Sequence, residues 1–277
     1  MIPNRESGAD RPNEELLEFD PYSEPAPETA APETAAPESS AADVAAEETS
    51  PGPGEEQGNV AWLGRSDLRT GILLLGGTSL ADFRVRFAQA QLRSDLTPSH
   101  WSMCGLLGED GTVQTVPLQP ADIGEVPVTN AVRTMSVDDF DDAQAWPNIA
   151  VLRFAEGTAA IDDHVATAMR RTVVDLPALL LSWLGFVWGV GDNPLVGGKG
   201  VPSAVFVETC YGLAGIELTP GLSSSASCPE AIWQAVKWWH EYYAGVAEIG
   251  ASEAGSVRPS GNYLVRQPSA QMAIAER

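Results

Sequence analysis

The most informative stretch of this chain reads PSAVFVETCYGLAGIELTP and covers residues 202–220. Its middle part, from Ala204 to Leu213, is predicted to form a helix, and Gly215 marks the end of that helix. Ser203 stands immediately before the helix, where free backbone N–H groups and the positive end of the helix dipole favour an anion. The stretch therefore places a hydroxyl group at a helix N-terminus.

Outward from this helix, the chain alternates short apolar runs with longer helical patterns, which predicts an α+β fold. Strands are predicted over residues 70–77, 101–108, 112–118 and 148–154, and helices over residues 79–93, 178–189, 229–243 and from Asp162 or Asp163 to about Val174. The Glu-Asp-Gly sequence at residues 109–111 is a good hairpin turn signal.

Two of these helices carry a marked apolar pattern. Residues 178–189 are apolar all round, which predicts a buried helix. Residues 79–93 gather apolar side chains on one face, namely Leu80, Phe83, Phe87 and Ala90.

The segment at residues 202–220 resembles the nucleophile segment of the NlpC-type papain-like cysteine hydrolases, which has the form C-S-G-L-V-x-x-A-Y-x-x-A-G-I-x-L. The matching positions are Phe206-Val207 for Leu-Val, Tyr211 for Tyr, residues 214–216 for Ala-Gly-Ile and Leu218 for Leu, with Thr219 and Pro220 following. In this register Ser203 occupies the position of the nucleophilic cysteine.

A second segment, TPSHWSMCGLLGEDGTV at residues 97–113, resembles the histidine strand of the same superfamily, which has the form S-H-V-G-L-Y…G-x-V. The matching positions are Ser102 for Ser and residues 105–107 for Gly-Leu-Tyr, with Gly111 and Val113 closing the hairpin. In this register Met103 stands where the catalytic histidine is expected, and Thr115 matches the third catalytic position.

The order of the two segments resembles the circularly permuted branch of the superfamily, because the histidine strand precedes the nucleophile helix. That branch includes acyltransferases related to lecithin:retinol acyltransferase and bacterial lipid or peptide hydrolases. Residues 71–87 resemble the opening strand and helix of these domains, so the resemblance covers roughly residues 68–245. It implies a permuted papain-like domain, with an antiparallel sheet packed on helices.

The resemblance also implies that the catalytic positions are degenerate. In the family, the helix dipole lowers the pKa of the cysteine, a histidine takes its proton, and a third polar residue orients that histidine. Met103 cannot accept a proton, and the Ser203 hydroxyl is too basic to attack at pH 7 without a partner base. We therefore expect an inactive relative of the cysteine hydrolases that acts as a binding or cargo module, with no cofactor and no metal.

Two alternatives stay open at this point. The first is an active hydrolase or acyltransferase on an amide, peptide or lipid ester, with Ser203 as nucleophile and His100 as base. His100 lies three residues before Met103. An odd offset on a strand points to the opposite face, so this role requires a later strand start or a bulge. The second is a structural interaction protein in which the pocket is vestigial and an aromatic helix makes the contacts.

That aromatic helix is the last one predicted, at residues 229–243. Trp238 with Tyr242, and Trp239 with Tyr243, form i,i+4 pairs, so these side chains cannot all face one core. We expect part of the aromatic surface to cover the domain and part to contact a protein partner or ligand.

The three cysteines are odd in number and far apart, which excludes a disulfide framework and a CxxC metal site. Cys104 and Cys210 are expected to be buried. Cys228 precedes Pro229 at a helix start, where a thiolate is favoured. The glycine-rich loop at residues 189–200 lacks the GxxxxGK[ST] spacing of nucleotide-binding loops and is expected to be a flexible link.

Residues 1–58 are predicted to be a disordered acidic tail, followed by the domain at residues 59–250 and a loosely ordered extension at residues 251–277. The tail holds fifteen Asp and Glu against two Arg, and it repeats APETA, so it cannot bury enough apolar surface to offset the entropy of ordering it. It is either a solubilising spacer or a tether for a docking peptide at residues 14–24. The apolar residues of that peptide are Leu16, Leu17, Phe19 and Tyr22.

The 277 residues carry 38 acidic and 16 basic side chains, which gives a net charge of −22 and a pI near 4.3. This balance argues against nucleic acid and against an anionic membrane surface as partners. The N-terminal residues lack the pattern of a secretory signal. The most apolar run, at residues 176–190, is shorter than the ~20 residues of a membrane span. We expect a cytoplasmic location, with signal-independent export as an alternative.

Overall fold

The computed structural model describes residues 58–66, 68–118, 129–154, 165, 167–169, 173–247 and 262–266. All of them belong to one compact unit, Ser50–Arg277. The predicted tail up to residue 57, with its docking peptide at residues 14–24, lies outside the described residues, as does the start of the helix predicted from Asp162 or Asp163.

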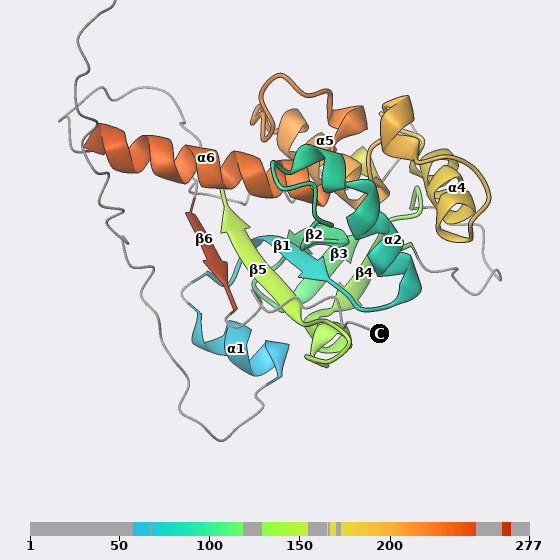
Figure 1. Ribbon diagram of the computed structural model, residues 1–277. Coiled ribbons are helices and arrows are strands. Elements are labelled where there is room, and N and C mark those ends of the chain that lie inside the picture. The colour runs from blue at the N-terminus through green and yellow to red at the C-terminus, as the bar shows by residue number, and fades with distance from the viewer. Residues whose placement is uncertain are drawn as a thin grey trace, which may run out of the picture. The chain divides into compact units, whose positions relative to one another are not determined.

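Six antiparallel strands form one sheet in the order β4-β3-β2-β1-β5-β6 (Figure 1). The strands are β1 (Gly71–Gly76), β2 (Met103–Leu107), β3 (Thr112–Thr115), β4 (Arg133–Ser136), β5 (Asn148–Arg153) and β6 (Asn262–Val265). The sequence of β1, GILLLG, is buried along its whole length because β1 pairs with β2 on one side and β5 on the other. The α+β class expected from the sequence is confirmed.

The predicted strands correspond to β1, β2, β3 and β5, and the hairpin between β2 and β3 is confirmed. Gly111 in its turn has φ 78°, a left-handed conformation that glycine adopts without a steric cost. The short strands β4 and β6 were not predicted. β6 lies in the extension expected to be loosely ordered, and its pairing with β5 orders it although its sequence shows no local period.

The helices lie on both sides of the sheet. They are α1 (Asn59–Arg65), α2 (Leu80–Ala88), α4 (Leu176–Val187), α5 (Pro202–Leu213) and α6 (Pro229–Ala247), with short 3-10 turns η1 (Ala90–Leu92), η2 (Val137–Phe140), η3 (Pro194–Gly197) and η4 (Ser224–Ala226). In Figure 1, α2, α4, α5 and α6 lie on one side of the sheet and α1 lies on the other. Two hydrophobic clusters match these two sides, the larger one containing residues of α2, α4, α5 and α6.

Strand β2 contributes to both clusters, since alternate side chains point to opposite faces of a sheet. Cys104 and Leu106 belong to the cluster shared with α5. Met103 and Leu107 belong to the cluster on the other face, which contains Phe140 of η2. This alternation positions the residues of the candidate site.

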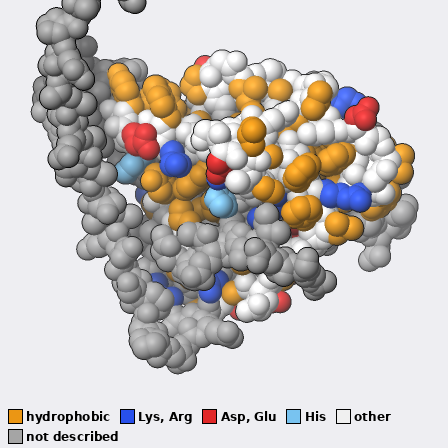
Figure 2. Space-filling view, viewed as in Figure 1, with side chains coloured by type: hydrophobic (Ala, Val, Ile, Leu, Met, Phe, Trp, Pro, Cys, Tyr) orange, Lys and Arg blue, Asp and Glu red, His pale blue; other side chains and the backbone are white. Residues whose placement is uncertain are grey.

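The outer surfaces of α2 and α4 carry exposed apolar side chains. The apolar face of α2 points to solvent, with Leu80 66% and Phe87 60% exposed, whereas Val85 and Ala88 form the buried face. The expectation that residues 178–189 are buried all round is wrong, because Leu181 of α4 is 70% exposed. Figure 2 shows hydrophobic side chains gathered over these two helices. In the described part of the chain, no helix combines the length and apolarity needed to cross a membrane.

Candidate functional site

Ser203 stands in the first turn of α5 and is almost fully buried. Pro202 opens the helix, where its fixed φ suits the first helical position and its missing N–H costs nothing. The Ser203 hydroxyl accepts a hydrogen bond from the backbone N–H of Cys104 at 3.3 Å, and the Cys104 thiol lies 3.9 Å from the same oxygen. The N-terminus of α5 therefore contacts the start of β2.

Thr115 meets the same residue of β2 from the neighbouring strand. Its hydroxyl donates a 2.6 Å hydrogen bond to the carbonyl oxygen of Cys104, and the side chain is fully buried. Ser203 and Thr115 thus bond the N–H and the C=O of Cys104, and Met103 precedes that residue in the chain. The structure therefore brings Ser203 and Thr115 together at one residue of β2, the neighbour of Met103 in the chain.

The side chain of Met103, however, belongs to the hydrophobic cluster on the face of the sheet opposite α5. The residue of β2 that faces Ser203 is Cys104. The resemblance implies that the side chain at position 103 faces the nucleophile helix. This expectation is wrong, because the side chain points to the other face of the sheet. Met103 and Ser203 nevertheless line the same pocket.

This pocket has a volume of about 50 Å³ and opens near the start of β2. Its lining is mainly apolar, with a polar group formed by Ser79, Asp82, Ser102 and Ser203; the apolar lining residues are Ala81, Val85, Met103, Val116, Pro117, Leu118, Met135, Phe140 and Trp146. Ser203, Val116 and Phe140 are buried and form its floor, whereas Ser79 is exposed and Asp82 is half-buried at its mouth.

Asp82 was not singled out from the sequence. Its backbone N–H donates to the Ser79 hydroxyl, which caps α2, and its carboxylate accepts hydrogen bonds from Ser79 at 2.5 Å and from Ser102 at 2.6 Å. The spacing of Ser79 and Asp82 matches a capping box, and this is the signal that reveals the pair in the sequence. The bond to Ser102 joins α2 to the residue before β2.

The thiols near the site are poor nucleophiles. Burial raises the pKa of Cys104 far above its usual range, and burial raises the pKa of Cys210 and of Cys228 to about 12. A buried thiol is protonated at neutral pH, and the reactive species is the thiolate. The preference for a thiolate at the helix start after Cys228 is therefore outweighed by the burial of that residue.

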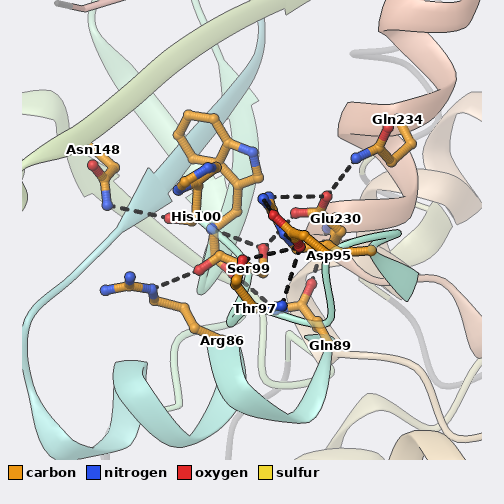
Figure 3. A network of polar contacts seen from close by, with 11 residues as sticks. Arg86, Gln89, Asp95, Thr97, Ser99, His100, Asn148, Glu230 and Gln234 are labelled. Carbon is orange, nitrogen blue, oxygen red and sulfur yellow. Dashed lines mark hydrogen bonds and ion pairs between the residues drawn. The ribbon is translucent and has the colours of Figure 1, made fainter. Parts of the chain in front are cut away.

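His100 lies outside the contacts of Ser203. Burial, with a contribution from nearby Arg93, lowers the pKa of His100, so the ring is neutral at pH 7. Its ring contacts Trp101 edge-on, and its carbonyl oxygen accepts a 3.3 Å hydrogen bond from Asn148 (Figure 3). Within the described residues, no hydrogen bond joins His100 to Ser203.

A polar network surrounds the segment that contains His100 (Figure 3). At its centre is the fully buried Glu230 of α6, whose carboxylate accepts 2.6 Å hydrogen bonds from Ser99 and Gln234 and lies 3.7 Å from the Arg93 guanidinium. The side-chain oxygen of Gln89 accepts a hydrogen bond from the backbone N–H of Glu230. This network holds α6 against the segment before β2.

A second buried carboxylate, Glu208, lies on α5. It accepts hydrogen bonds from Thr219 at 2.6 Å and Ser227 at 3.0 Å, and burial raises its pKa. These bonds hold the segment after α5 and the segment before α6 against the helix. Thr219 and Ser227 both follow irregular loops, so no regular spacing in the sequence predicts that either residue contacts Glu208.

The aromatic surface of α6 divides into two parts. Trp239 packs against the larger hydrophobic cluster, whereas Trp238 is 53% and Tyr242 is 50% exposed. The exposed rings stack on each other, with centroids 5.3 Å apart and an interplanar angle of 16°. The side chain of Tyr243 lies outside the described residues.

Across the described ranges, no group of three or more His, Cys, Asp or Glu side chains is arranged to hold a metal ion. In comparisons with family models, curated proteins and solved structures, nothing matches this chain.

Proposed function

We propose that the chain is a circularly permuted papain-like domain of the NlpC type whose catalytic positions are replaced. In this proposal the domain acts as a binding or cargo module, and the acidic N-terminal tail tethers it to a protein partner. The pocket beside Ser203 is the ligand site.

The environment of Ser203 carries this proposal. The residue stands at a helix N-terminus against the strand that contains Met103, close to Thr115 on the next strand. The Ser203 hydroxyl contacts the N–H and the thiol of Cys104, and neither group takes a proton from a serine at neutral pH. With no base in contact with it in the described part of the chain, the hydroxyl is a weak nucleophile, so binding without turnover is the activity that this arrangement supports best.

The enzyme alternative uses His100 as the base. The lowered pKa of His100 leaves a ring nitrogen able to accept a proton at pH 7. A general base must also lie within hydrogen-bond reach of the hydroxyl that it activates. No such bond to Ser203 exists among the described residues, which makes this alternative the weaker one.

A serine-reactive fluorophosphonate probe tests the two functions against each other. We expect the full chain to show the same background labelling as a Ser203→Ala variant, because no base contacts the hydroxyl among the residues that the structure describes. Labelling that is lost in both Ser203→Ala and His100→Ala would overturn the proposal and establish the enzyme.

The exposed pair Trp238 and Tyr242 favours a role in protein interaction as a second candidate function. Stacked aromatic rings that are half exposed are typical of interface anchors. Pull-downs with the full chain, the chain without residues 1–58, and a Trp238→Ala/Tyr242→Ala variant separate the two surfaces. We expect partner capture to fall when the tail is removed; capture that falls only in the aromatic variant would assign the contact to α6.

A further inference from the structure

The pocket beside Ser203 has an apolar floor and a charged mouth. Val85, Met103 and Val116 are buried in its wall, whereas the carboxylate of Asp82 lies at its half-exposed entrance. Among the described lining residues, Asp82 is the one that carries a charge. A ligand that enters this pocket therefore meets one anionic group before it meets apolar side chains.

The volume of the pocket limits what enters it. A cavity of about 150 Å³ accommodates a benzene ring. The pocket here has about 50 Å³ and accommodates the end of a short alkyl chain. The remainder of a ligand then lies at the mouth, beside Asp82.

The carboxylate of Asp82 keeps acceptor capacity for such a ligand. An ionised carboxylate offers about four lone-pair sites. Ser79 and Ser102 donate one hydrogen bond each. These two donors also fix the orientation of the carboxylate, so that a further donor arriving from the mouth meets a preorganised acceptor.

One nearby cation moderates the charge of Asp82 without bonding to it. The Arg86 guanidinium interacts with Asp82 electrostatically, and it donates hydrogen bonds to the carbonyl oxygens of Ser99 and Gly77. The capping of α2 accounts for the bond between Asp82 and Ser79. It does not account for the position of the carboxylate at the mouth of an apolar pocket, where its negative charge favours a cation.

We propose that this pocket selects ligands that carry a short alkyl group next to an ammonium group, with the alkyl end against Met103 and Val116 and the ammonium beside Asp82. The inference rests on the proposed function, since it names the ligand class of the same site. Neutral and anionic ligands of the same shape bind the pocket less tightly.

Three probes of similar size and different charge test this selectivity: butylammonium, butanol and butyrate. Each is titrated into the full chain at pH 7, and amide chemical shifts of β2 and α2 report the dissociation constant. We expect butylammonium to bind up to about fivefold more tightly than butanol, since a partly exposed ion pair contributes up to about 1 kcal/mol. Butyrate is expected to bind weakest.

Three variants locate the effect. Asp82→Asn removes the charge and keeps one acceptor oxygen for one of the two serine hydroxyls, while its amide NH2 donates to the other, so it should make butylammonium and butanol bind equally. Asp192→Asn, an exposed carboxylate on the loop before η3, is the matched control and should leave the order unchanged. Ala81→Leu fills the mouth and should weaken all three probes.

The possible results distinguish a failure of the charge selectivity from a failure of the proposed function. Equal binding of butylammonium and butanol to the unmodified chain overturns the charge selectivity and leaves the binding module intact. Absence of shifts at β2 and α2 with all three probes overturns both. Labelling of Ser203 by the fluorophosphonate probe overturns the proposed function alone.

Discussion

Cys104 is the residue around which the candidate site is organised. Its N–H donates to Ser203, its carbonyl oxygen accepts from Thr115, and its thiol lies against the Ser203 hydroxyl. The thiol itself is unreactive because its burial disfavours the charged form. Around Cys104, the polar groups that remain for contact with a ligand are therefore hydroxyl groups and backbone amides, with the Asp82 carboxylate elsewhere in the same pocket.

Thiol labelling tests whether the three cysteines are unreactive. We expect iodoacetamide at pH 7 to label all three cysteines slowly in the native chain, since burial raises the pKa of each. Labelling should become fast only in urea, where the chain unfolds. A single cysteine that reacts far faster than the others at pH 6 would show that one thiol lies in a catalytic environment.

Glu208 gives a prediction about pH. Burial raises its pKa in the folded chain, so the folded state binds the proton more tightly than the unfolded state does. Its contribution to stability is therefore fully present below its unfolded pKa and is lost as pH rises through its folded pKa. Glu208→Gln removes this dependence. We therefore expect the stability of the variant, relative to that of the unmodified chain, to increase as the pH rises from 5 to 8.

Urea unfolding at both pH values measures that difference. Glu241→Gln is the matched control, because Glu241 lies exposed on α6. A Glu208→Gln variant whose relative stability falls with rising pH would contradict the assigned direction of the pKa shift.

Some residues of the buried polar contacts could be predicted from the sequence, and others could not. Ser203 and Thr115 were singled out from motif positions, and they do meet at one residue of β2. Glu230 was not found, because its partner Ser99 lies 131 residues away and no local spacing connects them. Contacts of that sequence separation depend on the tertiary fold, which a single sequence does not specify locally.

Among the elements, α6 depends most on buried polar contacts. The Glu230 carboxylate holds its first turn against Ser99 and Arg93 of the segment before β2. Removing one partner of a buried charged group leaves the others unpaired, so we expect Glu230→Ala to cost about 3–5 kcal/mol of unfolding free energy.

Urea unfolding measures this cost, and Glu241→Ala on the exposed side of the same helix should cost less than about 0.5 kcal/mol. Equal effects of the two variants would show that the network does not hold α6 in place.

Strands with strong local sequence signals were predicted correctly, whereas the short strands β4 and β6, which lack such signals, were missed. The sequence of β1 is continuously apolar, and β2 and β3 flank a glycine turn. By contrast, β4 is mostly exposed, and the four residues of β6 are ordered through pairing with β5. The solvent exposure of the apolar face of α2 was also not predicted, because helical periodicity identifies which residues share a face but not whether that face is buried.

For the molecule as a whole, we propose that Ser203 and Met103 occupy the positions of a lost cysteine and histidine. The two residues line one pocket, although the Met103 side chain packs toward the other face of the sheet. The double change Ser203→Cys/Met103→His tests this claim. Each substitution is close in size to the original and is expected to cost about 1–2 kcal/mol.

The decisive measurement is the rate of iodoacetamide labelling of residue 203 near neutral pH, compared between the double variant and Ser203→Cys alone. Because positions 103 and 203 line the same pocket, an imidazole at position 103 that turns into this pocket is expected to reach the new thiol and lower its pKa, so the double variant labels faster. A double variant that folds, as judged by its urea unfolding curve, but labels no faster than the single variant would contradict the claim. In that case positions 103 and 203 do not form a catalytic pair, and the permuted papain-like interpretation fails.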